Sequence, residues 1–520
     1  MSFVDRRALL AAMAAMGLVA VPAIAGAPAS PSSGLSFGPP RPFSFAALRA
    51  RARKLASASY QPPELPAKAV IQGVDFDQVQ KIHFRQQDAL WRSVSGADPV
   101  AFFHLSKDTP APVSIFAVQR DGAGKRIARQ VLFSPDYFDY QGTGLDPKTL
   151  TKAGFAGFRV MDGQDSPVDW LAFQGASYFR SAGQDGQYGA SARGIAINTA
   201  LKTAEEFPRF SQFWLEERRS AVTIDALLEG PSVTGAYRFE CVRRKQGQVV
   251  MDVHCDLFFR ADISRLGIAP LTSMYWYGEN ERAKAIDWRP EIHDSDGLAI
   301  WNGNGERIWR PLINPPKLET NAFMDDNPRG FGLMQRDRNF DDYQDDDAFY
   351  NKRPGVWVEP KGKWGRGAVQ LVEIPTDDEI HDNIVVYWRP DRQIGNGDRL
   401  SCDYRLYWQD AIPGYPKTLA KAVATRIGLL GAHVAGKRKF VIDWEGGALD
   451  QLAQRFDVTP VITNSAGQIE GAYVIKVVGT DRWRSLFDLT LAGTPTTNLR
   501  CYLKLADKTL SETWIYQYFP

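Results

Sequence analysis

The stretch from Tyr237 to His254, YRFECVRRKQGQVVMDVH, holds two apolar runs on either side of a polar turn that contains Gly247. The first run alternates apolar and polar side chains, and the second is rich in valine. Both features are typical of β-strands that pair across a tight turn. We therefore predict a pair of antiparallel strands here.

The same texture recurs along the chain. Gly and Pro, with 44 and 32 residues, separate the apolar runs in the manner of many-stranded β proteins. Further strands are predicted at 356–359, 368–374, 384–388 and 400–408. Helical patterns are few, and the best candidates are 45–56, 77–85, 147–153 and 204–218. The predicted fold class is therefore mainly all-β.

The length of 520 residues exceeds one small core and predicts more than one domain. A run of turn-forming residues at 411–420 is the predicted linker. It divides a β-sandwich domain at 44–410 from a C-terminal domain at 421–520. The latter has the size and texture of an immunoglobulin-like sandwich, with strands predicted at 437–444, 458–465, 469–478, 485–491 and 498–504. The segment 26–43, rich in Pro, Ser and Gly, is predicted to be a disordered leader.

An export signal begins the chain. Arg6 and Arg7 precede an apolar stretch from Ala8 to Val21, and Ala23-Ile24-Ala25 offers a small-residue cleavage site. A membrane-spanning helix needs about 20 apolar residues, and this run is shorter. We predict a cleaved twin-arginine signal peptide at 1–25 and a periplasmic location for the mature protein.

Composition excludes several functional classes. Loss of Asp5, Arg6 and Arg7 with the signal lowers the formal net charge from +2 to +1, so no nucleic-acid partner is expected. The four cysteines are too few for a disulfide scaffold. Cys241 and Cys255 lie on the two predicted hairpin arms and either form a disulfide or remain buried thiols. No metal-binding motif or cofactor fingerprint is present, so neither a metal nor a cofactor is predicted.

Two carboxylate clusters with aromatic surroundings point to a chemistry. They are His293-Asp294-Ser295-Asp296 and the segment from Glu373 to Asn383. Cleavage of a glycosidic bond needs an acid to protonate the leaving oxygen and a base to activate water, while aromatic rings hold the sugars. A third acidic run, Asp341 to Asp347, lacks the pattern of a calcium loop and is interpreted as an exposed loop or a lid over the glycan groove.

Longer motifs resemble a known family. These are SMYWYGEN at 273–280, DWRPEIHDSDGL at 287–298, Trp364-Gly365, VEIPT at 372–376 and DNIV at 382–385. In this order they resemble the periplasmic glucan biosynthesis proteins G and D, and the twin-arginine signal is more like the D branch. The resemblance implies a large galactose-mutarotase-like β-sandwich followed by an immunoglobulin-like domain. It also implies action on β-1,2-linked glucan, with some members acting as inverting glucanases.

Carried over to this chain, the resemblance makes Asp382 the catalytic acid and Asp294 and Glu379 the other acidic residues of the site. An apolar neighbourhood at the start of the strand 384–388 would keep Asp382 protonated, and Asp294 would be the base. Which of these two is acid and which is base stays open. The residues predicted to bind glucan are Trp276, Tyr277, Trp288, Arg289, His293, Trp364, His381 and Asn383.

Two functional classes remain. The first is an enzyme that hydrolyses linear β-1,2-glucan or transfers the cleaved chain to a sugar hydroxyl, which would trim or cyclise it. The second is a non-catalytic glucan-binding or assembly factor that works with a membrane glucan synthase. A homodimer is left open in both.

Overall fold

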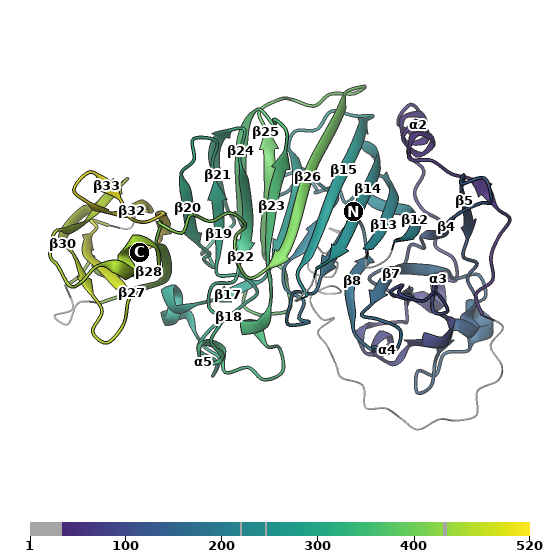
Figure 1. Ribbon diagram of the computed structural model, residues 1–520, viewed down its shortest axis with the longest axis horizontal. Helices are drawn as coiled ribbons and strands as arrows, with labels where there is room; N and C mark the ends of the chain where they lie inside the picture. Colours follow the sequence, from purple (N-terminus) through teal and green to yellow (C-terminus); the bar gives the residue numbers. More distant parts are fainter. Residues whose placement is uncertain (1–33, 219–220, 245–246, 430–433, 494) are drawn as a thin grey trace. The chain divides into compact units, whose positions relative to one another are not determined.

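The computed structural model describes residues 34–520, except 219–220, 245–246, 430–433 and 494 (Figure 1). The predicted signal peptide therefore lies outside the described residues. The chain divides into two compact units, which are described separately. The first contains the described residues up to Pro270 together with Pro360–Lys363 and Tyr387–Trp408, and the second contains Leu271–Glu359, Trp364–Val386 and Gln409–Pro520. Strands dominate both units, which confirms the predicted fold class.

The first unit contains one long run of paired strands, in the order β1-β5-β4-β12-β13-β14-β15-β26. A second sheet runs β16-β10-β9-β8-β7-β3, β11 pairs with β16, and β2 pairs with β6. The bounds are β1 Arg41–Pro42, β2 His83–Phe84, β3 Val100–His104, β4 Ser114–Arg120, β5 Arg126–Gln130, β6 Phe138–Asp139, β7 Phe155–Met161, β8 Asp169–Gln174, β9 Tyr178–Ser181, β10 Ser191–Arg193, β11 Ile195–Ile197, β12 Arg209–Arg218, β13 Ala221–Glu229, β14 Val233–Arg243, β15 Val249–Phe259, β16 Leu266–Ser273 and β26 Arg399–Gln409.

The predicted hairpin is confirmed by the antiparallel pair β14 and β15, in which Cys241 lies opposite Met251 and Cys255 opposite Tyr237. Because these two cysteines do not face each other, they form no disulfide. All four cysteines are buried and free, so the thiol alternative holds.

The predicted helix at 204–218 is wrong. Residues Arg209–Arg218 form β12, which pairs in parallel with β4 and antiparallel with β13. Its side chains Phe210, Phe213, Trp214 and Leu215 are all buried. Phe213, Trp214 and Leu215 are consecutive and all buried, so both faces of the strand are covered and its apolar run loses the period-2 alternation that would have identified it.

The other helix predictions fared better. The helix α2, Phe45–Ala56, matches its predicted bounds, and the Ser44 side chain caps it by accepting a hydrogen bond from the Ala47 N–H. The predicted helix at 77–85 is the short α4, Phe76–Lys81, and that at 147–153 is the 3₁₀ turn η3, Pro147–Leu150. The remaining short helices of this unit are α3 Lys68–Ile71, η1 Gln86–Asp88 and η2 Pro135–Tyr137.

The predicted disordered leader differs from the structure in its described part. The strand β1 pairs with β5, and Phe37 forms a bridge with Val131. Phe43 also stacks on Trp214 with ring centroids 4.9 Å apart. The two aromatic residues of this Pro-rich stretch, Phe37 and Phe43, thus make apolar contacts that a disordered segment would lack.

The second unit contains the strand runs β23-β22-β19-β20-β34-β32-β29, β21-β24-β25, β17-β18 and β27-β28-β31-β30 (Figure 1). Its elements are β17 Tyr275–Tyr277, η4 Glu279–Lys284, β18 Ile292–His293, β19 Gly297–Trp301, β20 Arg307–Pro311, β21 Glu319–Asp326, β22 Gly330–Met334, α5 Phe340–Tyr343, η5 Tyr350–Lys352, β23 Gly355–Lys361, β24 Arg366–Glu373, β25 Ile384–Pro390, β27 Lys421–Gly428, β28 Lys437–Glu445, η6 Gly447–Gln451, β29 Val458–Asn464, β30 Gln468–Lys476, β31 Trp483–Thr490, β32 Thr497–Leu505, β33 Lys508–Thr509 and β34 Thr513–Tyr518.

The five strands predicted after residue 421 are all present, while β27, β33 and β34 were missed. The last strand, β34, pairs in parallel with β20 through Ile308 opposite Thr513 and Trp309 opposite Trp514. The C-terminal segment therefore completes a sheet that begins more than 150 residues earlier in the chain. The predicted division at 411–420 stays a prediction.

Among the described residues, no helix is long and apolar enough to cross a membrane.

Candidate functional site

The two acidic segments predicted to act together lie in the second unit, and a buried asparagine joins them. Asn383 accepts a hydrogen bond from the Tyr275 N–H at 2.8 Å and donates to the Tyr275 and Ile374 carbonyls at 2.9 Å each. It therefore closes the base of the loop between β24 and β25 and ties it to β17. Because β17 pairs with β18, and Asp294 directly follows β18, the loop that carries Asp382 is tied to the strand pair that carries Asp294.

Asp294 is buried, with 4 % of its surface exposed, and has a buried cation as its partner. Arg353 donates through Nη1 to Asp294 Oδ1, and its guanidinium lies 4.3 Å from the centre of the Tyr350 ring. The Ala348 carbonyl accepts two further hydrogen bonds from Arg353, at 3.1 and 3.2 Å. A guanidinium with a restricted orientation thus holds the side chain of Asp294 in place.

Glu379 is held by a second arginine. Arg289 donates to both of its carboxylate oxygens, at 2.8 and 2.9 Å, in the bidentate geometry that orients a carboxylate best. The Tyr350 hydroxyl also donates to Glu379 Oε2. Tyr350 therefore contacts Glu379 with its hydroxyl and the Asp294-bound Arg353 with its ring face.

Arg289 also forms ion pairs with two more carboxylates, Asp287 and Asp345. Hydrogen bonds from Arg289 lower the pKa of Asp287 below its usual value. Burial raises the pKa of Asp345, but hydrogen bonds from the Ala348 N–H and Arg289 lower it more, with a net decrease. Three carboxylates around one guanidinium leave this wall of the site negatively charged. Asp345, within the acidic run interpreted as an exposed loop, is in fact buried here.

The predicted glucan-binding residues differ in their exposure. Trp288 presents 71 % of its surface and stands beside the Arg289 guanidinium, while Trp276 and Trp364 are partly buried. Tyr277 is fully buried, and its hydroxyl donates to the Arg289 carbonyl at 3.1 Å. Asn383 and His293 are also buried, and His381 pairs with Asp378 at 2.8 Å. Of the aromatic residues, Trp288 has the open ring face that sugar stacking requires.

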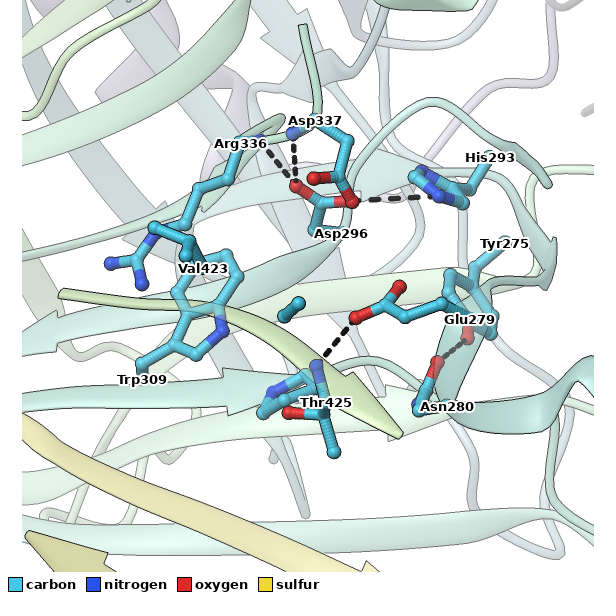
Figure 2. A pocket seen from close by; sticks show the side chains of 12 residues that line it. Tyr275, Glu279, Asn280, His293, Asp296, Trp309, Arg336, Asp337, Val423 and Thr425 are labelled. Carbon is cyan, nitrogen blue, oxygen red and sulfur yellow. Dashed lines mark hydrogen bonds and ion pairs between the residues drawn. The ribbon is translucent and has the colours of Figure 1, made fainter. Parts of the chain in front are cut away.

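A second group of ionisable side chains lies near Asp294 in the chain. We call it the acidic cluster, and it consists of Glu279, Glu291, His293, Asp296 and Asp337. Figure 2 shows that the side chains of Glu279, His293, Asp296 and Asp337 converge on a small pocket of about 20 Å³. Asp296 Oδ2 accepts hydrogen bonds from the Arg336 and Asp337 N–H groups, and Glu279 Oε1 accepts from the Thr425 N–H at 2.6 Å. The Arg336 side chain turns away to pair with Glu512.

This crowding shifts the ionisation of the cluster. Burial and the charge of Glu291 raise the pKa of Glu279 to about 8. Burial lowers the pKa of His293, but the hydrogen bond to Glu291 and the charge of Asp296 outweigh it and raise that pKa to about 9. Negative charge is therefore in excess around one imidazole.

Gln335 links the acidic cluster to the catalytic candidates. It is 1 % exposed, and its Nε2 donates to the carbonyls of His293, at 2.9 Å, and Tyr350, at 3.1 Å. Its Oε1 lies 3.0 Å from His293 Nδ1. The Gln335 amide thus binds both His293, which precedes Asp294, and Tyr350, which contacts Glu379, and so fixes the distance between them.

We expect Gln335→Leu to lower the free energy of unfolding by several kcal/mol, because three buried polar groups lose their partner at about 1–3 kcal/mol each. Urea denaturation measures this loss. Gln370→Leu is the matched control, because Gln370 is equally buried and its Oε1 has no hydrogen-bond partner among the described residues. Equal costs for the two variants would contradict the bridging role of Gln335.

Sequence reasoning missed Tyr350, Arg353, Gln335, Glu291 and Asp337. Glu291 lies inside the motif 287–298, two residues before His293, and could have been noticed. The others come from the segment 335–353, in which no motif distinguishes them from their neighbours.

Comparison with known proteins gives a consistent result. The family model described as periplasmic glucan biosynthesis protein, MdoG, matches residues 43–518. The chain is 46 % identical over 522 residues to glucans biosynthesis protein D of Stenotrophomonas maltophilia (strain R551-3), covering 98 % of this chain and 96 % of that protein. It is 45 % identical over 538 residues to glucans biosynthesis protein D 2 of Ralstonia nicotianae, covering 99 % and 98 %. It is 47 % identical over 525 residues to glucans biosynthesis protein D of Xanthomonas campestris pv. campestris (strain ATCC 33913), covering 98 % and 96 %.

Among solved structures, a polysaccharide lyase aligns with 70 % of this chain and 44 % of its own, with a TM-score of 0.21 and 9 % identity. That similarity is too low to carry an argument.

Proposed function

This chain belongs to the periplasmic glucan biosynthesis protein family, and from that premise we propose that it cleaves linear β-1,2-glucan with inversion at the anomeric carbon. The cleaved chain passes either to water, which is endo-hydrolysis, or to a sugar hydroxyl, which is transglycosylation or cyclisation. The same base activates either acceptor, so the two outcomes share one site.

The observation that supports this proposal best is that Arg353 binds Asp294 while Tyr350, three residues earlier, binds Glu379. Through these contacts, Asp294 and Glu379 are held by neighbouring groups of one short segment, although 85 residues separate them in the chain. A buried carboxyl group such as that of Asp294 is costly to maintain without a function, because it must be paired when it is charged. Glycoside cleavage is the chemistry that uses such carboxylates together.

Asp382 is the proposed acid. It is 5 % exposed and directly precedes Asn383, which fixes the end of its loop. Asp294 is the proposed base, which would accept a proton from the attacking hydroxyl, and Arg353 holds its carboxyl group in place. Glu379 and Tyr350 position the acceptor through their hydrogen bond. An inverting reaction places its two carboxyl groups about 6.5–9.5 Å apart, with the acceptor oxygen between them.

Trp288 is the proposed platform for a glucose ring. Its indole is exposed and lies beside Arg289, which in turn holds Glu379. A sugar face that stacks on the indole would therefore lie close to the charged wall of the site.

We further propose that the chain is exported to the periplasm through its twin-arginine signal. The family description names the same compartment.

The decisive experiment incubates the mature protein with linear β-1,2-glucan and determines the product masses. Linear fragments are expected for hydrolysis, and products lighter by one water for cyclisation. Linear β-1,3-glucan of similar length is the control and should remain intact. Unchanged β-1,2-glucan that nevertheless binds would instead support the non-catalytic glucan-binding or assembly factor.

A further inference from the structure

The acidic cluster takes no direct part in the proposed reaction, and its geometry calls for a separate explanation. The orientation of the His293 ring is set by Gln335. The Gln335 amide donates to two carbonyls through Nε2, so its Oε1 is the acceptor for His293 Nδ1–H. The other ring nitrogen, Nε2, therefore points into the cluster.

His293 Nε2 meets only carboxylates there. It lies 3.0 Å from Glu291 Oε2 and 3.5 Å from Asp296 Oδ1. The Tyr275 ring stacks on the imidazole with centroids 5.5 Å apart, and the Tyr343 ring meets it edge-on at 5.1 Å. An imidazole with one nitrogen bound to an amide oxygen and the other aimed at carboxylates has the arrangement of a metal-ligating histidine.

The charge of the cluster is not balanced by the residues around it. Glu279, Glu291, Asp296 and Asp337 together carry up to four negative charges, against one positive charge if His293 is protonated. The nearest guanidinium, on Arg336, is directed to Glu512 and lies 3.5 Å from the Trp309 ring centre. Among the residues that the structure describes, no hydrogen bond or ion pair is formed by the Asp337 carboxylate, which faces the pocket in Figure 2.

The distances between the ligand atoms are slightly larger than those in the coordination sphere of one ion. Glu291, His293, Asp296 and Asp337 each offer a ligand atom within 4.8 Å of the others. Two ligands bound at about 2.1 Å lie at most about 4.2 Å apart, so shifts of a few tenths of an ångström close the set. Three of them, His293, Asp296 and Asp337, line the cavity of about 20 Å³, which is large enough for a particle the size of one water molecule.

We propose that Glu291, His293, Asp296 and Asp337 form a binding site for one divalent transition-metal ion. One imidazole with three carboxylates suits Mn²⁺ or Zn²⁺, because Mg²⁺ and Ca²⁺ prefer oxygen ligands alone. Binding releases any proton on His293 Nε2, and the ion takes its place. The ion would join β18 to the turn after β22 and so brace the strand that leads to Asp294. The sequence shows no zinc-type spacing, because three ligands come from 291–296 and the fourth from 337.

The test uses the mature protein as purified and after treatment with a chelator. Metal content is measured by mass spectrometry, and thermal unfolding is followed during titration with MnCl₂ or ZnCl₂. We expect one equivalent of metal and a midpoint that rises with metal concentration, because a ligand that binds only the folded state stabilises it. Protein that carries no metal and whose midpoint responds to neither ion would overturn the proposal.

Asp337→Asn separates the metal from the alternative that protons alone balance the charge. In chelator-treated protein this variant should unfold at a higher temperature than wild type, because it removes one repelling charge. In saturating metal the order should reverse, since metal affinity falls by roughly tenfold or more. A stability gain that persists at all metal concentrations would refute the metal site.

Two further variants complete the test. Asp342→Asn is the matched control, because Asp342 lies nearby but outside the ligand set, and it should leave metal affinity unchanged. His293→Gln should abolish the metal response, provided that the variant folds. Binding of Co²⁺ tests the histidine ligand directly, because the visible absorption of bound Co²⁺ should change when His293→Gln removes the imidazole nitrogen. Binding that is insensitive to both Asp337→Asn and His293→Gln would place the ion elsewhere and also refute the proposal.

Discussion

Asp382→Asn is expected to lower the turnover of linear β-1,2-glucan by roughly 100-fold or more, with substrate binding retained. An amide has nearly the same shape as a carboxyl group but cannot protonate the leaving oxygen. The loop should keep its conformation, because the substitution leaves the hydrogen bonds from Asn383 to Tyr275 and Ile374 in place. Initial rates and direct binding of a glucan oligomer measure the two effects separately.

Asp377→Asn is the matched control for this prediction, because Asp377 lies in the same loop but is exposed. It should leave turnover within a factor of a few of wild type. Near-wild-type turnover in Asp382→Asn would remove Asp382 from the mechanism, and equal losses in both variants would indicate damage to the loop.

Asp294→Asn is expected to abolish turnover, because the amide cannot accept a proton from the attacking hydroxyl. The same change deprives the buried Arg353 of its counter-ion, which costs about 3–5 kcal/mol for a buried pair. Loss of activity must therefore be distinguished from loss of folding, and rates are measured well below the unfolding midpoint.

Asp443→Asn supplies the matched control for the ion pair. Asp443 is 2 % exposed and binds Arg484 through two hydrogen bonds, in the sheet formed by β28 and β31. Its replacement should cause a comparable loss of stability while turnover persists. If Asp294→Asn retained turnover, another group would have to be the base.

The stereochemistry of the first product tests both roles together. An inverting reaction forms no covalent intermediate, so cleavage of a β-linkage must initially give the α-anomer. Proton NMR during the first minutes, before mutarotation, reads this signal. An initial β-anomer would indicate retention and would make one of the carboxylates a nucleophile.

Local patterns in the sequence were sufficient for the fold class and for part of the strands, although no strand before Tyr237 was predicted. Alternation and β-branched content identified the pair β14 and β15, and the helix α2 was recognised from its periodicity. The prediction failed at β12, where both faces of the strand are buried and the alternation is lost. It also missed β34, whose partner β20 lies some 200 residues earlier. Strand pairing at such separation leaves no local trace.

The candidate site shows the same division. The motifs drew attention to Asp294, Glu379 and Asp382, and the structure holds the first two through Arg353, Arg289 and Tyr350. No spacing in the chain could have revealed these partners, since an ion pair depends on distance in space. Nor could it have shown that Tyr277 and His293 are buried while Trp288 is open to solvent.

The sequence by itself determined the β character of the chain and which segments carry its acidic residues, because secondary structure follows from side-chain periodicity within a few residues. Only the tertiary structure decided how those acids are used. It paired Asp294 and Glu379 with arginines and brought Glu291, His293, Asp296 and Asp337 close to one another beside a small cavity. The physical reason is that the charge state and role of a buried carboxylate depend on burial and on neighbours that long-range strand pairing brings into contact.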